Sequence, residues 1–144
     1  MSSLTVQLSG LGNLQAKLAA WKAAGSSGLK AGVAEGASLF EDAAKENAPV
    51  LTGRLRDGIH TEMVTDTPQT QTLMVTPVVA AANKYGFEPP YARRIEFGFV
   101  GTDSLGRHYH QAAQPYMRPA FDEKQTDAAA AVKDNVAESL QGVR

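Results

Sequence analysis

The residue types best suited to chemistry lie close together in the segment RHYHQ. His108 and His110 are two positions apart, so on a strand they would share one face. Two imidazoles that converge can hold a metal ion when a third ligand joins them, and Asp103 is a candidate. A small metal-dependent hydrolase is therefore one interpretation. Because the histidines sit in a Gly-rich loop and no HExxH-type motif is present, two solvent-facing histidines without a metal are favoured.

Other candidate groups lack the neighbours that catalysis needs. Glu41 and Asp42 are adjacent on a predicted helix and point in different directions, so they cannot flank one scissile bond. Ser26 and Ser27 have no GxSxG context. The chain contains no cysteine, which excludes disulfides, thiolate metal ligands and cysteine nucleophiles. We therefore predict that the protein is not an enzyme and has no cofactor.

Length and composition indicate one globular domain of 144 residues, 43% hydrophobic and 20% charged. No apolar run approaches the roughly 20 residues that cross a bilayer, and the first ten residues do not resemble a signal peptide. The net charge of −1 gives no nucleic-acid footprint. Charge is uneven: residues 35–46 are acidic and residues 93–118 are basic. These patches are either surfaces for recognition between copies or ordinary solvated faces.

The N-terminal third predicts one strand and two helices. Residues 4–8 alternate as a strand does, and an apolar stripe at helical spacing follows. The stripe consists of Leu11, Leu14, Leu18 and Trp21. The GSSG at 25–28 predicts a break before a second helix over 28–46, which stops near Asn47 because Ala48 precedes a proline. Gly32 and Gly36 each cost that helix roughly 1 kcal/mol relative to alanine, so we expect a neighbouring backbone to approach there.

The rest of the chain predicts an antiparallel hairpin and a long final helix. Strands are expected at 59–64 and 70–79 with a turn in TDTPQ, followed by a loop at 80–91. Residues 91–99 read as a short turn running into a strand, and 100–114 as a polar projecting loop. The last helix is expected over about 118–141, with Pro119 in its first position. Its expected buried stripe is Phe121, Ala128, Val132, Val136 and Leu140. The predicted fold class is α+β: a small, mainly antiparallel sheet packed against long helices in a single domain over residues 1–144.

Glu96 is a charge between Ile95 and Phe97, in the most aromatic part of the chain. A buried carboxylate needs a partner, because leaving it unpaired costs several kcal/mol. Our hypothesis is that Glu96 pairs with Arg54 or Arg118, within one chain or across two. The alternative is a strand whose outer face shows Glu96 to water.

Three segments together resemble a known family. They are NAPVLTGRLRDGI at 47–59, YARRIEFG at 91–98 and QPYMRPAF at 114–121. In this order, with a helix before the first and a long helix after the last, they resemble the tail-component family of tailed double-stranded DNA phages. Members of that family are described as head–tail joining, neck or tail-completion proteins, similar to the minor tail protein Z of lambda-like phages.

The resemblance rests on matched positions in each segment. The first block matches at Ala48, Pro49, Thr52, Gly53, Leu55 and Arg56, the second at Tyr91, Ala92, Glu96, Phe97 and Gly98, and the third at Pro115, Arg118, Pro119 and Ala120. Tyr116 stands where phenylalanine is usual, Phe99 where a small residue is common, and the loop at 100–114 is rather long. Arg54 and Met117 lie inside the blocks and complete the set of candidate interface residues.

The resemblance implies a structural virion protein of the neck or tail, assembled in the host cytoplasm. Such a protein forms a homo-oligomeric ring, with six copies matching a tail and twelve matching a portal; six is favoured. Its partners would be itself, adjacent connector and tail-tube proteins, and DNA that passes through the lumen without sequence-specific binding. A tail terminator or tube-associated minor tail protein is the alternative in the same class.

A ring subunit offers an interpretation of the third block. Pro115 and Pro119 stiffen the backbone, so docking on a neighbour would cost little entropy. Tyr116, Met117 and Phe121 would supply apolar contact, and Arg118 a directional anchor. The competing interpretation is the start of a helix folded onto its own core.

Overall fold

The computed structural model describes residues 10–50, 53–77 and 91–143. The strand predicted at 4–8 and most of the loop predicted at 80–91 lie outside the described residues. In chain order the elements are α1 (Leu11–Asn47), α2 (Arg54–Gly58), β1 (Ile59–Asp66), β2 (Gln71–Pro77), α3 (Tyr91–Phe97), β3 (Phe99–Thr102), β4 (His108–Gln111) and α4 (Met117–Gln141). The α+β class is confirmed, with long helices beside two antiparallel hairpins, β1–β2 and β3–β4.

α1 is one continuous helix of 37 residues, so the break predicted at GSSG is wrong. The helix ends at Asn47 as predicted, with Ala48 in an extended conformation. Gly28 is buried against α4, and a Cβ there would lie 2.6 Å from the carbonyl oxygen of Asn135. Tertiary packing therefore overrides the weak helix propensity of these residues.

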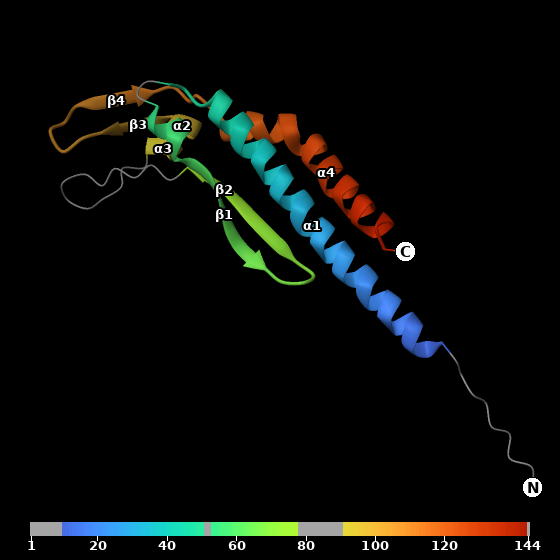
Figure 1. The fold of residues 1–144 in the computed structure, drawn as a ribbon. Helices are drawn as coiled ribbons and strands as arrows, with labels where there is room; N and C mark the ends of the chain where they lie inside the picture. Colours follow the sequence, from blue (N-terminus) through green and yellow to red (C-terminus); the bar gives the residue numbers. More distant parts are fainter. Residues whose placement is uncertain (1–9, 51–52, 78–90, 144) are drawn as a thin grey trace, which may run out of the picture.

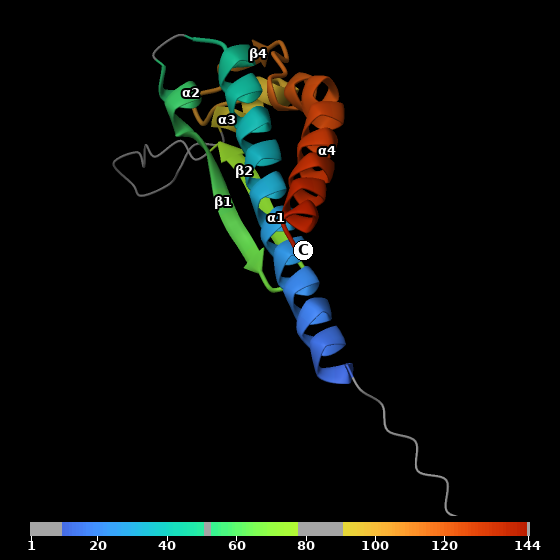
Figure 2. The same ribbon diagram turned by 45° about the vertical axis from the view of Figure 1, so that its right-hand side comes forward.

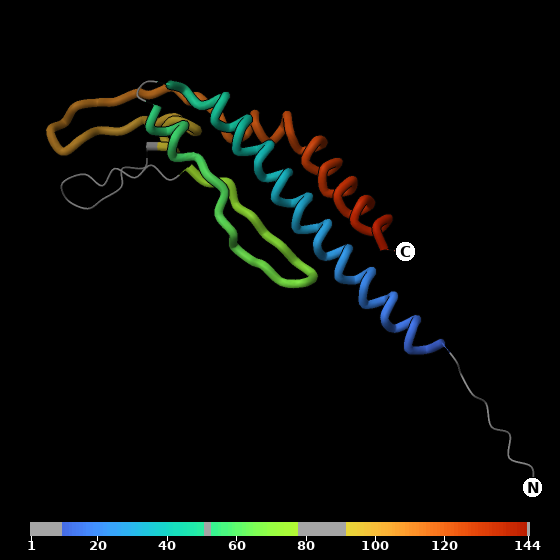
Figure 3. The backbone as a smooth tube through the Cα atoms, in the orientation of Figure 1, coloured from blue at the N-terminus to red at the C-terminus, as the bar shows by residue number. Residues whose placement is uncertain are grey.

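α1 occupies the middle of the molecule, with the β1–β2 hairpin on one side and α4 on the other (Figures 1 and 2). The two helices run antiparallel, as the backbone trace shows (Figure 3). Gly32 and Gly36 lie in their contact: an added Cβ would stand 2.5 Å from the Cα of Val132 and 3.2 Å from the Cβ of Ala128. The close backbone approach that these glycines predicted is confirmed.

The N-terminal part of α1 extends beyond the end of α4 (Figure 3). Leu140, near the end of α4, lies opposite Gly25, whose added Cβ would be 3.8 Å from its Cδ2. The helix predicted for the apolar stripe Leu11, Leu14, Leu18 and Trp21 is present, but these side chains are 54–59% exposed. The stripe is amphipathic in pattern and has no covering element in the described part of the chain.

The β1–β2 hairpin is confirmed close to its predicted limits. Its strands pair from Ile59 opposite Pro77 to Asp66 opposite Gln71, with an irregularity between Met63 and Thr65. Lys30 of α1 binds Asp66 at 2.6 Å and holds the hairpin's outer end against the helix.

The region after residue 90 is more ordered than predicted. Residues 91–97 form a helix, α3, and the strand begins only at Phe99, because Gly98 takes a φ of 75° and turns the chain. Residues 100–114 are not a plain loop, because they contain most of the β3–β4 hairpin. The hairpin does project from the end of the molecule, as expected (Figure 1).

α4 begins at Met117, one residue before the predicted start, so Pro119 is its third residue and not its first. Ala128 is buried as predicted, and Val132, Val136 and Leu140 are partly buried. Phe121 was expected inside, but it is 54% exposed and stacks on Phe40 of α1 at a centroid distance of 5.5 Å. Ala120, one residue earlier, occupies the inward position instead.

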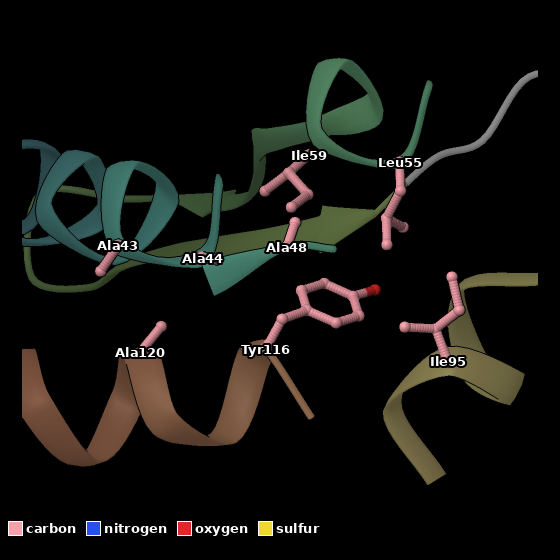
Figure 4. Close-up of a cluster of buried hydrophobic side chains, with 8 residues drawn as sticks. All are labelled: Ala43, Ala44, Ala48, Leu55, Ile59, Ile95, Tyr116 and Ala120. Atoms are coloured by element: carbon pink, nitrogen blue, oxygen red, sulfur yellow. The ribbon is translucent and has the colours of Figure 1, made fainter. Parts of the chain in front are cut away.

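The main core lies at the end of the molecule where α1 finishes and α4 begins (Figure 4). It comprises Ala43, Ala44, Ala48, Leu55, Ile59, Ile95, Tyr116 and Ala120. Half of these residues are alanines, so the core is thin and depends on backbones that approach closely. Tyr116 and Ile59 are its largest fully buried side chains.

Candidate assembly site

The three motif blocks meet in one place. Leu55 from the first, Ile95 from the second and Tyr116 from the third are at most 4% exposed and belong to the same core cluster. Figure 4 shows the Tyr116 ring lying between Ile95 and the side of the cluster formed by Leu55 and Ile59. Segments far apart in the sequence are therefore joined here by side chains that the motif contains.

Glu96 caps the start of α4. Its Oε2 accepts hydrogen bonds from the backbone N–H groups of Tyr116 at 2.8 Å and Met117 at 3.0 Å, and its Oε1 accepts one from the N–H of Arg118 at 3.1 Å. Within the chain the observed donors are main-chain amides and not the guanidinium of Arg54 or Arg118, whereas a guanidinium partner from a second copy stays a hypothesis. The alternative of a carboxylate open to water is wrong, since Glu96 is partly buried and bonded.

These contacts explain why a proline stands in the first turn of α4. A helix leaves its first four N–H groups without intrahelical partners. With Tyr116 as the N-cap, the first three of these groups bind Glu96, and the fourth position is Pro119, which has no N–H. A carboxylate at this end also interacts favourably with the helix dipole.

Gly98 allows the backbone of the second block to lie close to the segment that leads into the third. Its φ of 75° lies in the left-handed region that favours glycine, and an added Cβ would lie 2.8 Å from the carbonyl oxygen of Gln111. The N–H of Gln114 donates to the carbonyl of Ile95 at 2.7 Å. In the Glu96-Phe97-Gly98 motif the glutamate thus caps α4. The glycine leaves room for the backbone of residues 111–113, which lead into α4.

Tyr116 is 1% exposed, and its phenol is a titratable group inside the core. Burial, and secondarily the negative charge of Glu96, raise the pKa of Tyr116 to about 12. Tyr116 therefore supports the core of the chain itself.

The candidate residues differ in accessibility. Arg54, Arg56, Phe97, Pro115, Arg118 and Pro119 are exposed; Pro49, Gly53, Ala92, Glu96, Gly98 and Met117 are partly buried; Leu55, Tyr116 and Ala120 are buried. Gly53 adopts the predicted positive φ, at 76°. Thr52 lies outside the described residues, and Tyr91 is placed only as the first residue of α3. Among the described residues of the three blocks, Phe97 is the most exposed large apolar side chain, at 73%.

His108 and His110 lie on β4, two positions apart as predicted. Nδ1 of His108 is 2.9 Å from Oγ1 of Thr102. Asp103 accepts hydrogen bonds from Arg107 and Tyr109 and from the N–H of Leu105, so its carboxylate organises the hairpin turn. These bonds, led by that from the Arg107 N–H, lower the pKa of Asp103. The described residues bring no three potential metal ligands together.

Part of each predicted charge patch is engaged in contacts within the chain. In the acidic segment Glu41 binds Lys45 and accepts a hydrogen bond from Thr61 at 2.7 Å, and both contacts lower its pKa. In the basic segment Arg107 binds Asp103 at 2.7 Å. The guanidinium of Arg94 lies 4.1 Å from the centre of the Phe99 ring.

An open apolar groove of about 570 Å³ lies between α1, β2 and α4. Its lining includes Val33 and Phe40 of α1, Leu73 and Met74 of β2, and Ala129 and Val132 of α4. Much of the remaining wall consists of alanine and glycine. The sequence did not predict this groove; Gly32 and Gly36 predicted only the close backbone approach beside it.

The protein is thus a small α+β domain, and residues of the three motif blocks hold its helices and hairpins together. The chain belongs to the phage tail-component family described as "Bacteriophage HK97-gp10, putative tail-component", which it matches over residues 13–98. That match contains the first two motif blocks, and the third follows it. No curated protein and no solved structure matches the chain. Within the described residues, no helix is long and apolar enough to span a membrane.

Proposed function

We propose that this tail component is a virion protein of the head–tail connector, assembled in the host cytoplasm. Copies of the chain would form a ring that joins the portal assembly to the tail, or completes the tail. Family membership over residues 13–98 is the observation that carries the proposal. Six copies would match the symmetry of a tail and are favoured over twelve; a tail terminator or tube-associated minor protein is the alternative.

The surface of the single chain supports a role in assembly. Phe97, Val100 and Leu105 are 73–76% exposed on or beside the projecting hairpin, and such apolar groups gain from burial against another protein. A net charge of −1 suits a lumen through which DNA must slide, because each phosphate that a protein neutralises adds affinity. Arg118 and the prolines beside it remain candidates for the contact between copies.

Imaging of virions that carry a labelled copy of the chain tests the proposal directly. The label should appear in a layer between portal and tail tube, with six- or twelvefold symmetry. Arg118→Ala should weaken assembly of that layer while leaving the free energy of unfolding within about 0.5 kcal/mol, as is usual for surface positions. Lys133→Ala, an equal loss of charge on α4, is the matched control. A label elsewhere in the particle, or a chain absent from it, contradicts the proposal.

A further inference from the structure

The apolar stripe and the apolar groove are two incomplete surfaces on one molecule. The stripe, Leu11 to Trp21, protrudes beyond α4 and is more than half exposed. The groove lies farther along α1, on the stretch Val33 to Ala44. Because α1 is one continuous helix, the stripe cannot fold back into the groove of its own chain. Within residues 10–50, 53–77 and 91–143 no element covers either surface, so each is open to another copy of the chain.

We propose that the apolar stripe of one copy docks in the apolar groove of the next. The inference rests on the proposed function, in which copies of the chain form a ring. A protruding surface that fits a different surface of the same molecule makes a heterologous contact, and such contacts close into rings when the rotation between copies allows it. The proposal identifies which surfaces make that contact.

The two surfaces agree in length. The stripe extends over ten residue steps of helix, which is about 15 Å at 1.5 Å per residue. The α1 wall of the groove, from Val33 to Ala44, extends over eleven steps, or about 16 Å. The projecting β3–β4 hairpin is the other exposed apolar arm, but its apolar side chains are not arranged as a helical row.

The two surfaces also agree in shape and polarity. The stripe presents three leucines and a tryptophan, whereas Ala37 and Ala129 give the groove walls short side chains. Phe121 and Met74 border the groove and are about half exposed, so a docked helix would bury them. This is the arrangement in which an amphipathic helix inserts its apolar row into a hydrophobic groove.

Charge favours the same pairing. Residues 10–25, which carry the stripe, contain Lys17 and Lys22 and no carboxylate. β1, β2 and α4 together contain seven carboxylates and three lysines or arginines. A basic helix approaching acidic elements is steered toward them, and the same charges oppose the pairing of two stripes with each other.

Paired cysteines test the contact, because the chain contains no cysteine of its own. Under mild oxidation, Leu14→Cys combined with Ala129→Cys should give a ladder of covalent multimers. Ala23→Cys with Ala129→Cys is the matched control, because Ala23 lines a separate cavity beside Pro68, away from the stripe, and it should give no ladder. Dimers from Leu14→Cys alone would show that stripes pair with stripes and would overturn the proposal.

A second pair of variants tests the groove without cysteines. Ala129 and Ala130 are adjacent exposed residues of α4, but only Ala129 lines the groove. Ala129→Arg should raise the concentration for half-assembly by more than about tenfold, as for a central interface residue. Ala130→Arg should leave it near the unsubstituted value. The emission of Trp21, the only tryptophan, should shift to longer wavelength when the unsubstituted protein dissociates.

These outcomes separate the inference from the proposed function. Rings that persist in Ala129→Arg, or that form without cross-linking of the 14–129 pair, overturn the inference and leave the connector role standing. A cross-linked ladder from a chain that imaging places outside the neck and tail overturns the connector role and leaves the contact. Absence of the ladder both in concentrated protein and in assembled particles overturns the inference.

Discussion

At the scale of single residues, Glu96 decides how α4 starts. Its two oxygens accept three backbone N–H groups, and the fourth N–H that a helix start leaves free is absent because residue 119 is proline. Glu96, Pro119 and Gly98 therefore act together to fix how α3 meets the start of α4. The candidate interface residues of the second and third blocks differ accordingly: some build this junction of α3 and α4, and others, such as Arg118, extend from it.

Replacement of Glu96 tests the cap. Glu96→Ala should lower the free energy of unfolding by about 2 kcal/mol, because it removes charge-assisted hydrogen bonds and a favourable dipole interaction. Glu96→Gln should cost less, since an amide oxygen still accepts. Urea denaturation measures both. The Arg118 side chain makes none of these bonds, so a double-mutant cycle between Glu96 and Arg118 should give a coupling below about 0.5 kcal/mol; a larger coupling would restore the guanidinium hypothesis.

Tyr116 predicts a loss of stability at high pH. Its pKa is about 12 in the folded chain, whereas an unfolded tyrosine titrates near 10. The folded state therefore holds the phenol proton of Tyr116 more tightly than the unfolded state does. The resulting contribution to the free energy of unfolding is complete below pH about 10. It is lost as pH rises toward 12, by roughly 3 kcal/mol in total. Tyr116→Phe removes the titrating group. Its free energy of unfolding should fall less steeply over that range, and equal slopes would contradict the buried phenol.

At the scale of elements, the α1–α4 contact depends on glycine. Gly32→Ala would place a Cβ 2.5 Å from the Cα of Val132, so the helices must separate. We expect a net loss of about 1–3 kcal/mol despite the better helix propensity of alanine. Gly12→Ala is the matched control, since nothing lies within 4 Å of its added Cβ. Thermal unfolding should show the control unchanged or slightly stabilised; a stabilised Gly32→Ala would disprove the close packing.

The elements also show what the sequence could and could not predict. The β1–β2 hairpin and the end of α1 followed from local signals: alternation, a turn and a proline. The break at GSSG was wrong because glycine there serves a contact with α4, more than 100 residues away, that local propensity cannot register. Glu96 was recognised as needing a partner, but three amides of a helix start leave no mark of their own in the sequence. The apolar groove depends on three elements at once and was not predicted.

At the scale of the whole molecule, the core cluster and the protruding stripe of the proposed contact lie at different ends of α1, whereas the groove borders the core. The core cluster gathers around the C-terminal end of α1, from Ala43 to Ala48. The apolar stripe lies at the other end, beyond the reach of α4. Changes to the protruding N-terminal end of α1 should therefore affect assembly without affecting stability. This is the arrangement expected of a subunit that folds before it meets its neighbours.

Removal of residues 1–21 tests that separation. The shortened chain keeps Gly25 and every α1 residue after it, together with the whole of α4, so its free energy of unfolding should change by less than about 1 kcal/mol, as for most surface changes. Circular dichroism during urea denaturation measures this without Trp21. Assembly should be lost, because the stripe is gone while the groove remains. A shortened chain that fails to fold would show that the protruding helix belongs to the subunit's own core, and one that still assembles would show that copies meet elsewhere.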